Sequence, residues 1–317
     1  MGLWIVAHLS MGVSDMKKFL IKIAIFFAIV AIVDVSLGMA FHYLQAHAGG
    51  RTGAEYYVCE KATEDVIIMG SSRASHHYVP EIISEKLGMS CFNAGQDGNG
   101  IILQYGRWKM LKQHNIPKLI IYDISPSFDF GISDNMTYVD RLKPFSKKNA
   151  INEYISTLFP MERVKMQSQL YCYNYKFIEM LSDCLRSSNY RELSGYIPLN
   201  GHIRKEIVER KNMKRGSKIE IDEIKCYYLE QLIKEAQEVG TKTVLVMSPS
   251  WKGGNYTSKA FSVIKVISDK YSIPLYDYID SEICDNPDYF EDSSHLNDLG
   301  AKFFSSDLAT RIKNEVQ

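Results

Sequence analysis

The sequence predicts an α/β protein built on a doubly wound parallel sheet of about five strands, with a helical insertion and an N-terminal transmembrane helix. From residue 66 onward, short apolar runs alternate with segments of helical periodicity, the pattern of a parallel sheet joined by crossover helices. Residues 66–69 form a run without polar alternation, as expected for a strand covered on both faces. A separate apolar stretch at residues 23–41 predicts the N-terminal helix.

That apolar stretch contains 19 residues, and Asp34 is its only charge. A span of about 20 apolar residues crosses a bilayer, and a basic flank such as Lys17, Lys18 and Lys22 stays on the cytoplasmic side. We therefore expect a cytoplasmic N-terminus (1–18), a transmembrane anchor or signal segment (19–44), a glycine-containing linker (45–60) and a domain (61–317) outside the cytoplasm.

Two alternatives concern this N-terminal region. Gly38-Met-Ala40 has small residues where a signal peptidase would cut, although cleavage would export the domain equally. Met16, which two lysines follow, also looks like the natural start of the protein. The first fifteen residues would then be an upstream extension.

The predicted strands cover residues 66–69, 90–93, 118–123, 243–247 and 275–278. Between them, Pro80 opens a helix that Gly88 closes, and Asp222 caps a helix that Gly240 closes. Apolar residues at helical spacing predict further helices at 101–111, 257–271 and 299–312.

Residues 126–221 interrupt this alternation with about 95 residues that look helical and rich in tyrosine. An insertion of this length is too large for a loop, so we expect a helical cap or lid. It leaves the sheet after the third strand, and we expect it to overhang the site, with Phe128, Phe130 and Phe145 lining the approach and the sheet core independent of them. The tyrosines either pack in a core or stack on sugar rings.

Composition excludes several classes of function. Lys plus Arg and Asp plus Glu both number 37, so no net charge favours nucleic acid. The six cysteines include no Cys-x-x-Cys pair, and we expect most of them to be buried free thiols. No phosphate-binding loop, dinucleotide fingerprint or metal-binding histidine pair is present, so we expect no metal and no cofactor.

Two motifs point to nucleophilic catalysis. Ser72 ends a Gly-Ser-Ser turn just past the first predicted strand, while Asp292 and His295 lie three residues apart near the C-terminus. A nucleophilic serine needs a base, and the base needs an orienting carboxylate. All three residues follow predicted strand ends, the edge at which sites form in such sheets.

These motifs resemble the SGNH (GDSL-like) hydrolase superfamily, whose first block is a Gly-Asp-Ser-like turn and whose last block is Asp-x-x-His. The last block often continues into a Leu-Asn-x-x-Gly helix start, as at residues 296–300, and residues 93–98 look like the second block. The resemblance covers roughly residues 66–312 and implies a flavodoxin-like SGNH hydrolase fold. It implies Ser72 as nucleophile, His295 as base, Asp292 as its orienting partner, and an oxyanion hole formed by the N–H groups of Ser72 and Gly98.

Other roles remain open for these and neighbouring residues. Ser72 fits a helix N-cap, as do Asp292 and Asn297, with His295 then a polar surface residue. His76 and His77 compete for the role of base, and we expect them to be surface or lid contacts. Arg73 either binds a substrate carboxylate or forms a structural ion pair.

The third block departs from the family pattern. The third predicted strand continues as Tyr122-Asp-Ile-Ser-Pro-Ser127, without the asparagine that the family usually places there. Ser125 or Ser127 would be the substitute donors, and the departure fits divergent branches that act on acyl groups of polysaccharides. The basic stretch at 202–218 is either a solvated helix face or a contact for anionic lipid or acidic glycan.

The leading hypothesis is a membrane-anchored serine esterase in the bacterial periplasm or at the cell surface, which removes acyl groups, acetyl foremost, from a glycan or acts on another small ester. An O-acyltransferase of surface-polysaccharide synthesis would use the same acyl-enzyme. A non-catalytic envelope scaffold would retain only the fold. The sequence does not distinguish the oligomeric state.

Overall fold

Five strands form one parallel sheet in the order β2-β1-β3-β4-β5. They are β1 (Val66–Gly70), β2 (Cys91–Asn93), β3 (Leu119–Asp123), β4 (Lys242–Met247) and β5 (Leu275–Asp277). The computed structural model describes residues 13–174, 176–185, 193–208, 219–253 and 258–316. The predicted doubly wound sheet of about five strands is thus confirmed.

Alternate side chains of the central strands pack into two separate cores. Ile67 and Met69 of β1 face a core shared with α5 (Ile101–Leu111), α13 (Glu223–Glu238) and α14 (Ser258–Tyr271). Val66 and Ile68 face the opposite core, which includes residues of α3 (Ser72–His77), α4 (Pro80–Leu87) and α15 (Asp298–Val316). Helices therefore cover both faces, which explains why the strands are apolar throughout.

The expected helix signals are present. Pro80 lies in the first turn of α4, and Gly88 closes it in the left-handed region at φ 66°. Asp222 caps α13 by accepting the N–H of Ile224 at 2.9 Å.

The insertion is not independent of the sheet core, which corrects that part of the expectation from sequence. It contains α6 (Pro126–Asp129), α7 (Met136–Val139), η1 (Asp140–Phe145), α8 (Asn149–Leu158), α9 (Glu162–Lys165), α10 (Gln169–Tyr173), α11 (Phe177–Leu185) and α12 (Lys205–Val208). Phe130 and Phe145 are buried in the same core as Ile67 and Trp108, and partly buried Phe128 packs against it. The first part of the insertion therefore completes the domain core, because its apolar residues have no core of their own.

Several tyrosines of the insertion also serve packing. Tyr154, Tyr173 and Tyr196 are buried, which favours core packing over sugar stacking for these three. Tyr175 and Tyr190, like residues 209–218 of the basic stretch, lie outside the described residues.

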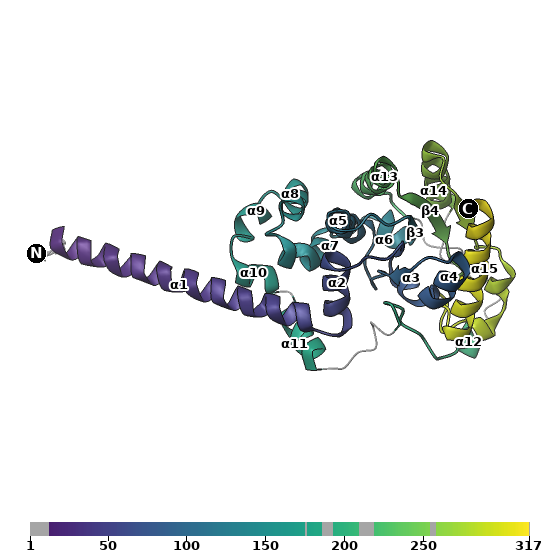
Figure 1. Cartoon of the computed structure of the whole chain (residues 1–317), viewed down its shortest axis with the longest axis horizontal. Helices are drawn as coiled ribbons and strands as arrows, with labels where there is room; N and C mark the ends of the chain where they lie inside the picture. Colours follow the sequence, from purple (N-terminus) through teal and green to yellow (C-terminus); the bar gives the residue numbers. More distant parts are fainter. Residues whose placement is uncertain (1–12, 175, 186–192, 209–218, 254–257, 317) are drawn as a thin grey trace, which may run out of the picture.

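Residues 13–60 of the described chain are almost entirely helical. The helix α1 (Val13–His47) projects from one end of the domain in Figure 1, and α2 (Gly50–Glu60) turns back onto the domain. Residues 15–47 have a mean hydropathy of 2.5 in the most apolar window, long and apolar enough to cross a membrane, as a signal sequence also would be. The expected linker at 45–60 is wrong, since Glu55, Val58 and Cys59 of α2 are buried and α2 packs on α5.

The cysteines are free thiols, as expected. Four of the six are buried, Cys226 is half-buried and Cys184 is exposed.

Candidate active site

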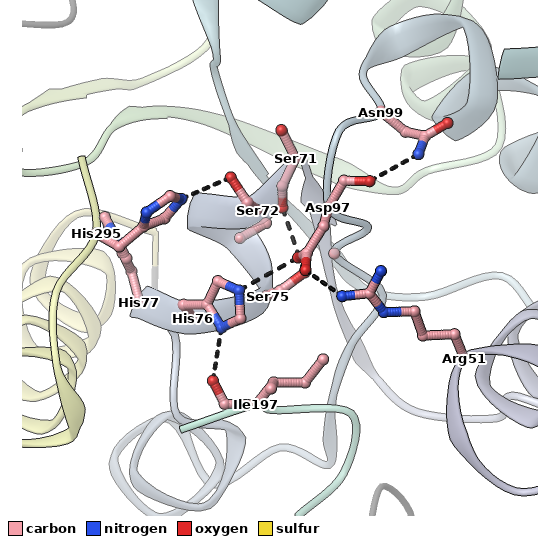
Figure 2. Close-up of polar contacts among 12 residues, drawn as sticks. Arg51, Ser71, Ser72, Ser75, His76, His77, Asp97, Asn99, Ile197 and His295 are labelled. Carbon is pink, nitrogen blue, oxygen red and sulfur yellow. Dashed lines mark hydrogen bonds and ion pairs between the residues drawn. The ribbon is translucent and has the colours of Figure 1, made fainter. Parts of the chain in front are cut away.

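Ser72 occupies the first position of α3, directly after the end of β1. Gly70 makes this sharp turn possible: its φ is +143°, and a Cβ would lie 2.6 Å from the carbonyl oxygen of Asp123. Ser71, not Ser72, stands at the N-cap, and its side chain makes no capping hydrogen bond. The hydroxyl of Ser72 instead points at His295 (Figure 2).

The structure joins Ser72, His295 and Asp292 in one hydrogen-bonded chain. Ser72 Oγ lies 2.8 Å from His295 Nε2, and His295 Nδ1 lies 3.0 and 3.1 Å from the two carboxylate oxygens of Asp292. With a proton on Nδ1 donated to Asp292, Nε2 is free to accept the serine proton. The three residues thus have the arrangement needed for an activated nucleophile.

The short loop around Asp292 holds that carboxylate in its ionised form. Asp292 Oδ1 also accepts the backbone N–H groups of Ser294 at 2.7 Å and His295 at 2.9 Å. Partial burial opposes ionisation, but the hydrogen bonds from His295 and the backbone outweigh it and lower the pKa of Asp292. A permanently charged Asp292 orients the imidazole of His295.

Gly98 lies in the loop that follows β2, with φ +70°. A Cβ built there would meet nothing within 4 Å, so this face of the loop is open. Further back, Gly95 allows the loop to touch α3, because a Cβ at Gly95 would lie 2.3 Å from the Ser75 amide nitrogen.

Asn93 fixes the start of the same loop. Its side-chain nitrogen donates to the carbonyls of Ala74 at 2.7 Å and Tyr78 at 3.0 Å. Its side-chain oxygen accepts the Gly95 N–H at 2.9 Å. Asn93 therefore connects the loop to α3, the element that carries Ser72.

His77 is buried, which corrects the expectation of a surface or lid contact. Its Nε2 accepts the backbone N–H of Leu296 at 3.0 Å, and Nδ1 lies 3.2 Å from the Ser248 hydroxyl. Burial, with His295 and Arg73 nearby, lowers the pKa of His77 well below its ordinary value. His77 is thus a neutral imidazole that holds the backbone next to His295.

His76 is also buried rather than on the surface, but it makes the expected contact with the insertion. Its Nδ1 donates to the carbonyl of Ile197 at 2.7 Å, and its Nε2 lies 3.3 Å from Asp97. Burial opposes the charged form, but Asp97 and Ile197 outweigh it and raise the pKa of His76. Figure 2 shows Arg51 reaching the same Asp97 from the side opposite His76.

Asp97 is a half-buried carboxylate with two basic partners. Burial opposes its ionisation, yet His76 and Arg51 lower the pKa of Asp97 to about 2. The loop that carries Gly98 is thereby linked to α3 through His76 and to α2 through Arg51.

The insertion approaches Ser72 and Asp292 through residues 193–203. The expected contacts at Phe128, Phe130 and Phe145 lie in or against the core instead. The N–H of Ile197 donates to the carbonyl of Ser75 at 3.0 Å, and Ser75 and His76 lie one helical turn from Ser72. The N–H of Ile203 donates to the carbonyl of Phe290 at 2.8 Å, close to Asp292 in the chain.

Arg107 holds the Gly98 loop through hydrogen bonds, a role that the sequence did not indicate. Its guanidinium donates to the Ala94 carbonyl at 2.6 Å, to Gln96 Oε1 at 3.1 Å and to Glu55 Oε1 at 3.0 Å. The available signal was an arginine inside a helical segment, next to Trp108 of its apolar stripe. Such a residue needs a buried partner.

Arg73 forms a structural ion pair, one of the two alternatives. Its Nε lies 3.7 Å from Asp123 Oδ2, and it also donates to the Ile124 carbonyl. Burial raises the pKa of Asp123. Arg73 therefore braces the ends of β1 and β3.

The two serines considered as replacement donors lie at the start of the insertion. Ser125 precedes α6, and its backbone N–H donates to Asp129 at 2.6 Å. Ser127 is exposed. Neither hydroxyl has a hydrogen bond to the Ser72–His295–Asp292 chain in the described part of the protein.

A cavity of about 280 Å³ lies beside the Gly98 loop. Its walls are α2, residues 93–97 and residues 193–198, and both Arg107 and Asp97 reach it. Ser72 and His295 are not among the described residues that line it. Ser75, one helical turn from Ser72, does line the cavity.

The arrangement supports nucleophilic chemistry at Ser72. No cluster of three or more potential metal ligands occurs among the residues that the structure describes.

No family model matches the sequence, and no curated protein matches it. The chain is similar in structure to a protein described as a lipolytic member of the G-D-S-L family, from Desulfitobacterium hafniense DCB-2. That similarity has a TM-score of 0.40 and 8% identity, over 78% of this chain and 98% of the other. A protein described as an acylhydrolase from Bacteroides fragilis NCTC 9343 gives a TM-score of 0.41 and 13% identity, over 84% and 97%.

The five-stranded parallel sheet has the architecture that the resemblance of the sequence motifs implies. Both TM-scores lie below 0.5, and we therefore base the functional proposal on the geometry of the site.

Proposed function

We propose that this protein is a membrane-anchored serine esterase of the SGNH type, which removes acyl groups, acetyl foremost, from a glycan outside the cytoplasm. The observation that carries the proposal is the chain from Ser72 Oγ to His295 Nε2 at 2.8 Å and from His295 Nδ1 to Asp292 at 3.0 Å. The partial exposure of these side chains supports the proposal: 24% of the His295 side chain and 48% of the Asp292 side chain are accessible to solvent. Solvent therefore reaches the His295 and Asp292 end of the hydrogen-bonded chain.

In the proposed reaction, Ser72 Oγ attacks the ester carbonyl while His295 Nε2 takes the hydroxyl proton. The carbonyl oxygen becomes an oxyanion, which the N–H groups of Ser72 and Gly98 stabilise. Each such donor is worth about 3–4 kcal/mol in acyl transfer. His295 then returns the proton to the leaving sugar hydroxyl, and an acyl group remains on Ser72.

Water completes the reaction. His295 removes a proton from a water molecule, which attacks the acyl group on Ser72 and releases the carboxylic acid. The regenerated serine recovers its proton from His295. Asp292 stays ionised throughout, in accord with its lowered pKa, and stabilises the imidazolium form.

Ser72→Ala tests the proposal. The full chain, purified in mild detergent, is assayed on a chromogenic acetyl ester and on an acetylated polysaccharide. Losing the nucleophile should lower kcat by about 10⁴-fold or more. Ser306→Ala on α15 is the matched control and should retain activity, because in the described part of the protein the Ser306 hydroxyl makes no hydrogen bond to Ser72, His295 or Asp292. Equal turnover by Ser72→Ala and the wild type would refute the assignment.

Two further readouts separate the alternatives. A fluorophosphonate probe should label Ser72, whereas a non-catalytic scaffold would leave it unlabelled. Supplying a glycan acceptor should leave free acetate as the main product. Transfer of most acyl groups to that acceptor would instead identify an acyltransferase, which shares the acyl-enzyme.

A further inference from the structure

The length of α1 conflicts with a domain that stands entirely clear of the membrane. The apolar run from residue 23 to residue 41 spans about 28 Å as a helix, at about 1.5 Å per residue. This matches the hydrocarbon core of a bilayer, which is about 30 Å thick. The whole run is therefore needed to cross the membrane.

The folded domain nevertheless contacts α1 well inside this run. Asp34 accepts hydrogen bonds from Ser168 Oγ at 2.7 Å and from the backbone N–H groups of Gln169 at 2.8 Å and Leu170 at 3.0 Å. Gly38 lies so close to Gln169 that a Cβ would come within 2.4 Å of its side chain. The start of α10 is thus fixed beside the middle of α1.

If the membrane ended at Asp34, only residues 23–33 would remain for the hydrocarbon. Eleven helical residues span about 16 Å, roughly half of the required thickness. Part of the domain around α10 must therefore lie at the depth of the lipid head groups.

The helices on either side of α10 carry apolar side chains that nothing in the described structure covers. On α11, Ile178 is 82% exposed, Leu181 38% and Leu185 88%. Their spacing of three and then four residues places them on one side of the helix, opposite the buried Met180.

Next to α9, Met161 and Val164 are each 69% exposed. Figure 1 shows α9, α10 and α11 grouped around α1 at the end of the domain from which α1 projects. We call these five side chains the α9–α11 face. This face lies beside α1 where that helix leaves the domain, so we expect its partner to be the surface of the membrane.

Charge at this face agrees with a lipid partner. Arg163 and Lys165 flank Val164, and both are exposed. Basic residues beside an apolar surface favour anionic lipid head groups.

We infer that the α9–α11 face lies in the interfacial layer of the same bilayer that α1 crosses, with its apolar side chains at the boundary between head groups and acyl chains. This inference rests on the proposed membrane anchoring of α1. The protein would then be attached at two places, and the domain would have a fixed orientation relative to the membrane.

Site-specific fluorescence in lipid nanodiscs tests this. The full chain carries Cys184→Ser and Cys226→Ser, since the other four cysteines are buried, and receives one new cysteine labelled with an environment-sensitive dye. Val164→Cys and Leu185→Cys report on the α9–α11 face. Val266→Cys on α14 is the matched control, because Val266 is 64% exposed and lies at the other end of the domain.

Val30→Cys, within α1, reports on anchoring itself. The nanodiscs contain phosphatidylcholine and phosphatidylglycerol with or without a quencher on the acyl chain, and circular dichroism checks the fold of each variant. We expect a blue shift and loss of emission at positions 30, 164 and 185, and neither at 266.

The outcomes separate the two proposals. Quenching at position 30 without quenching at 164 and 185 would overturn the interfacial face and leave the anchor intact. A blue shift at 164 and 185 without lipid quenching would indicate a protein partner and would also overturn the inference. No quenching at position 30 would refute the anchor and the inference together, while esterase activity would be judged separately by the Ser72→Ala assay.

Discussion

At the scale of single residues, two adjacent histidines have different tasks because successive positions on a helix point about 100° apart. His76 turns toward the insertion and pairs with Asp97. His77 turns toward the sheet and accepts the N–H of Leu296 at 3.0 Å. Both rings lie edge-on to His295, with centroids 5.6 Å away for His76 and 6.2 Å away for His77. Because His77 is the one that accepts a backbone N–H next to His295, we assign it the positioning role.

His77→Ala should lower kcat about tenfold, equivalent to about 1.4 kcal/mol of transition-state stabilisation, with little change in KM. The buried N–H of Leu296 would lose its acceptor, at a cost of roughly 1–3 kcal/mol in unfolding free energy. Steady-state kinetics and denaturant unfolding of the detergent-solubilised chain measure both effects.

His77→Gln is the informative control, since a glutamine oxygen can reach the place of Nε2 and accept the same N–H. It should restore most of kcat. A glutamine variant as slow as the alanine variant, with native stability, would contradict the positioning role.

At the scale of elements, α2, α5 and the insertion meet at one buried carboxylate. Glu55 of α2 lies 3.0 Å from Arg107 of α5 and 3.3 Å from Lys176, which precedes α11, with Arg141 at 3.9 Å. Burial opposes ionisation of Glu55, but these three cations lower its pKa to about 2. Burial lowers the pKa of Lys176, and the positive charges of Arg141 and Arg107 add to this effect.

Glu55→Gln should lower the unfolding free energy at neutral pH by roughly 3–5 kcal/mol, the usual effect of leaving buried charges without their partner. Because Arg107 would lose one support of the Gly98 loop, activity should fall as well. Urea unfolding followed by tryptophan fluorescence measures the first effect, with the exposed Glu238→Gln on α13 as control.

The pH dependence has a definite sign. A carboxyl whose folded pKa is lowered from 4.5 to about 2 contributes its full stability above about pH 4.5 and loses it as the pH falls toward 2. Wild-type stability should therefore decrease across this window, and the Glu55→Gln variant should show a shallower slope. Parallel slopes for the two proteins would contradict the assigned pKa.

At the scale of the whole molecule, aspartate side chains connect the N-terminal helices to the insertion in both directions. Asp34 of α1 accepts the first N–H groups of α10. Asp183 of α11 accepts the Thr52 N–H of α2 at 3.0 Å. The end of α1 is thus part of the folded domain, and its direction relative to the site is set by these contacts.

Asp34→Ala should loosen this connection. Loss of a capping carboxylate costs about 1 kcal/mol, so the amides of Gln169 and Leu170 should exchange with solvent roughly fivefold faster. Hydrogen exchange with mass spectrometry on peptides covering 166–172 measures this. Asp15→Ala on the same helix should leave these peptides unchanged, because among the described residues Asp15 pairs with nearby Lys18.

Features that depend on local pattern could be predicted from the sequence. The five strands, the proline and glycine boundaries of α4 and the cap of α13 follow from apolar periodicity and backbone preferences, which act over a few residues. The pairing of Ser72 with Asp292 and His295 was also predictable, because parallel strand ends meet at one edge of the sheet.

Only the tertiary structure decided which residues the buried charges pair with and where the insertion packs. Nothing near Arg107 or Glu55 in the sequence indicates that they meet, since the partners of a buried ion are set by helix packing between distant segments. For the same reason the expected lid proved to be core at Phe130 and Phe145, and the expected linker proved to be α2. The sequence by itself determined the sheet and the placement of Ser72, Asp292 and His295 at its edge, because short-range patterns specify them. Which residues support these three was decided by long-range packing.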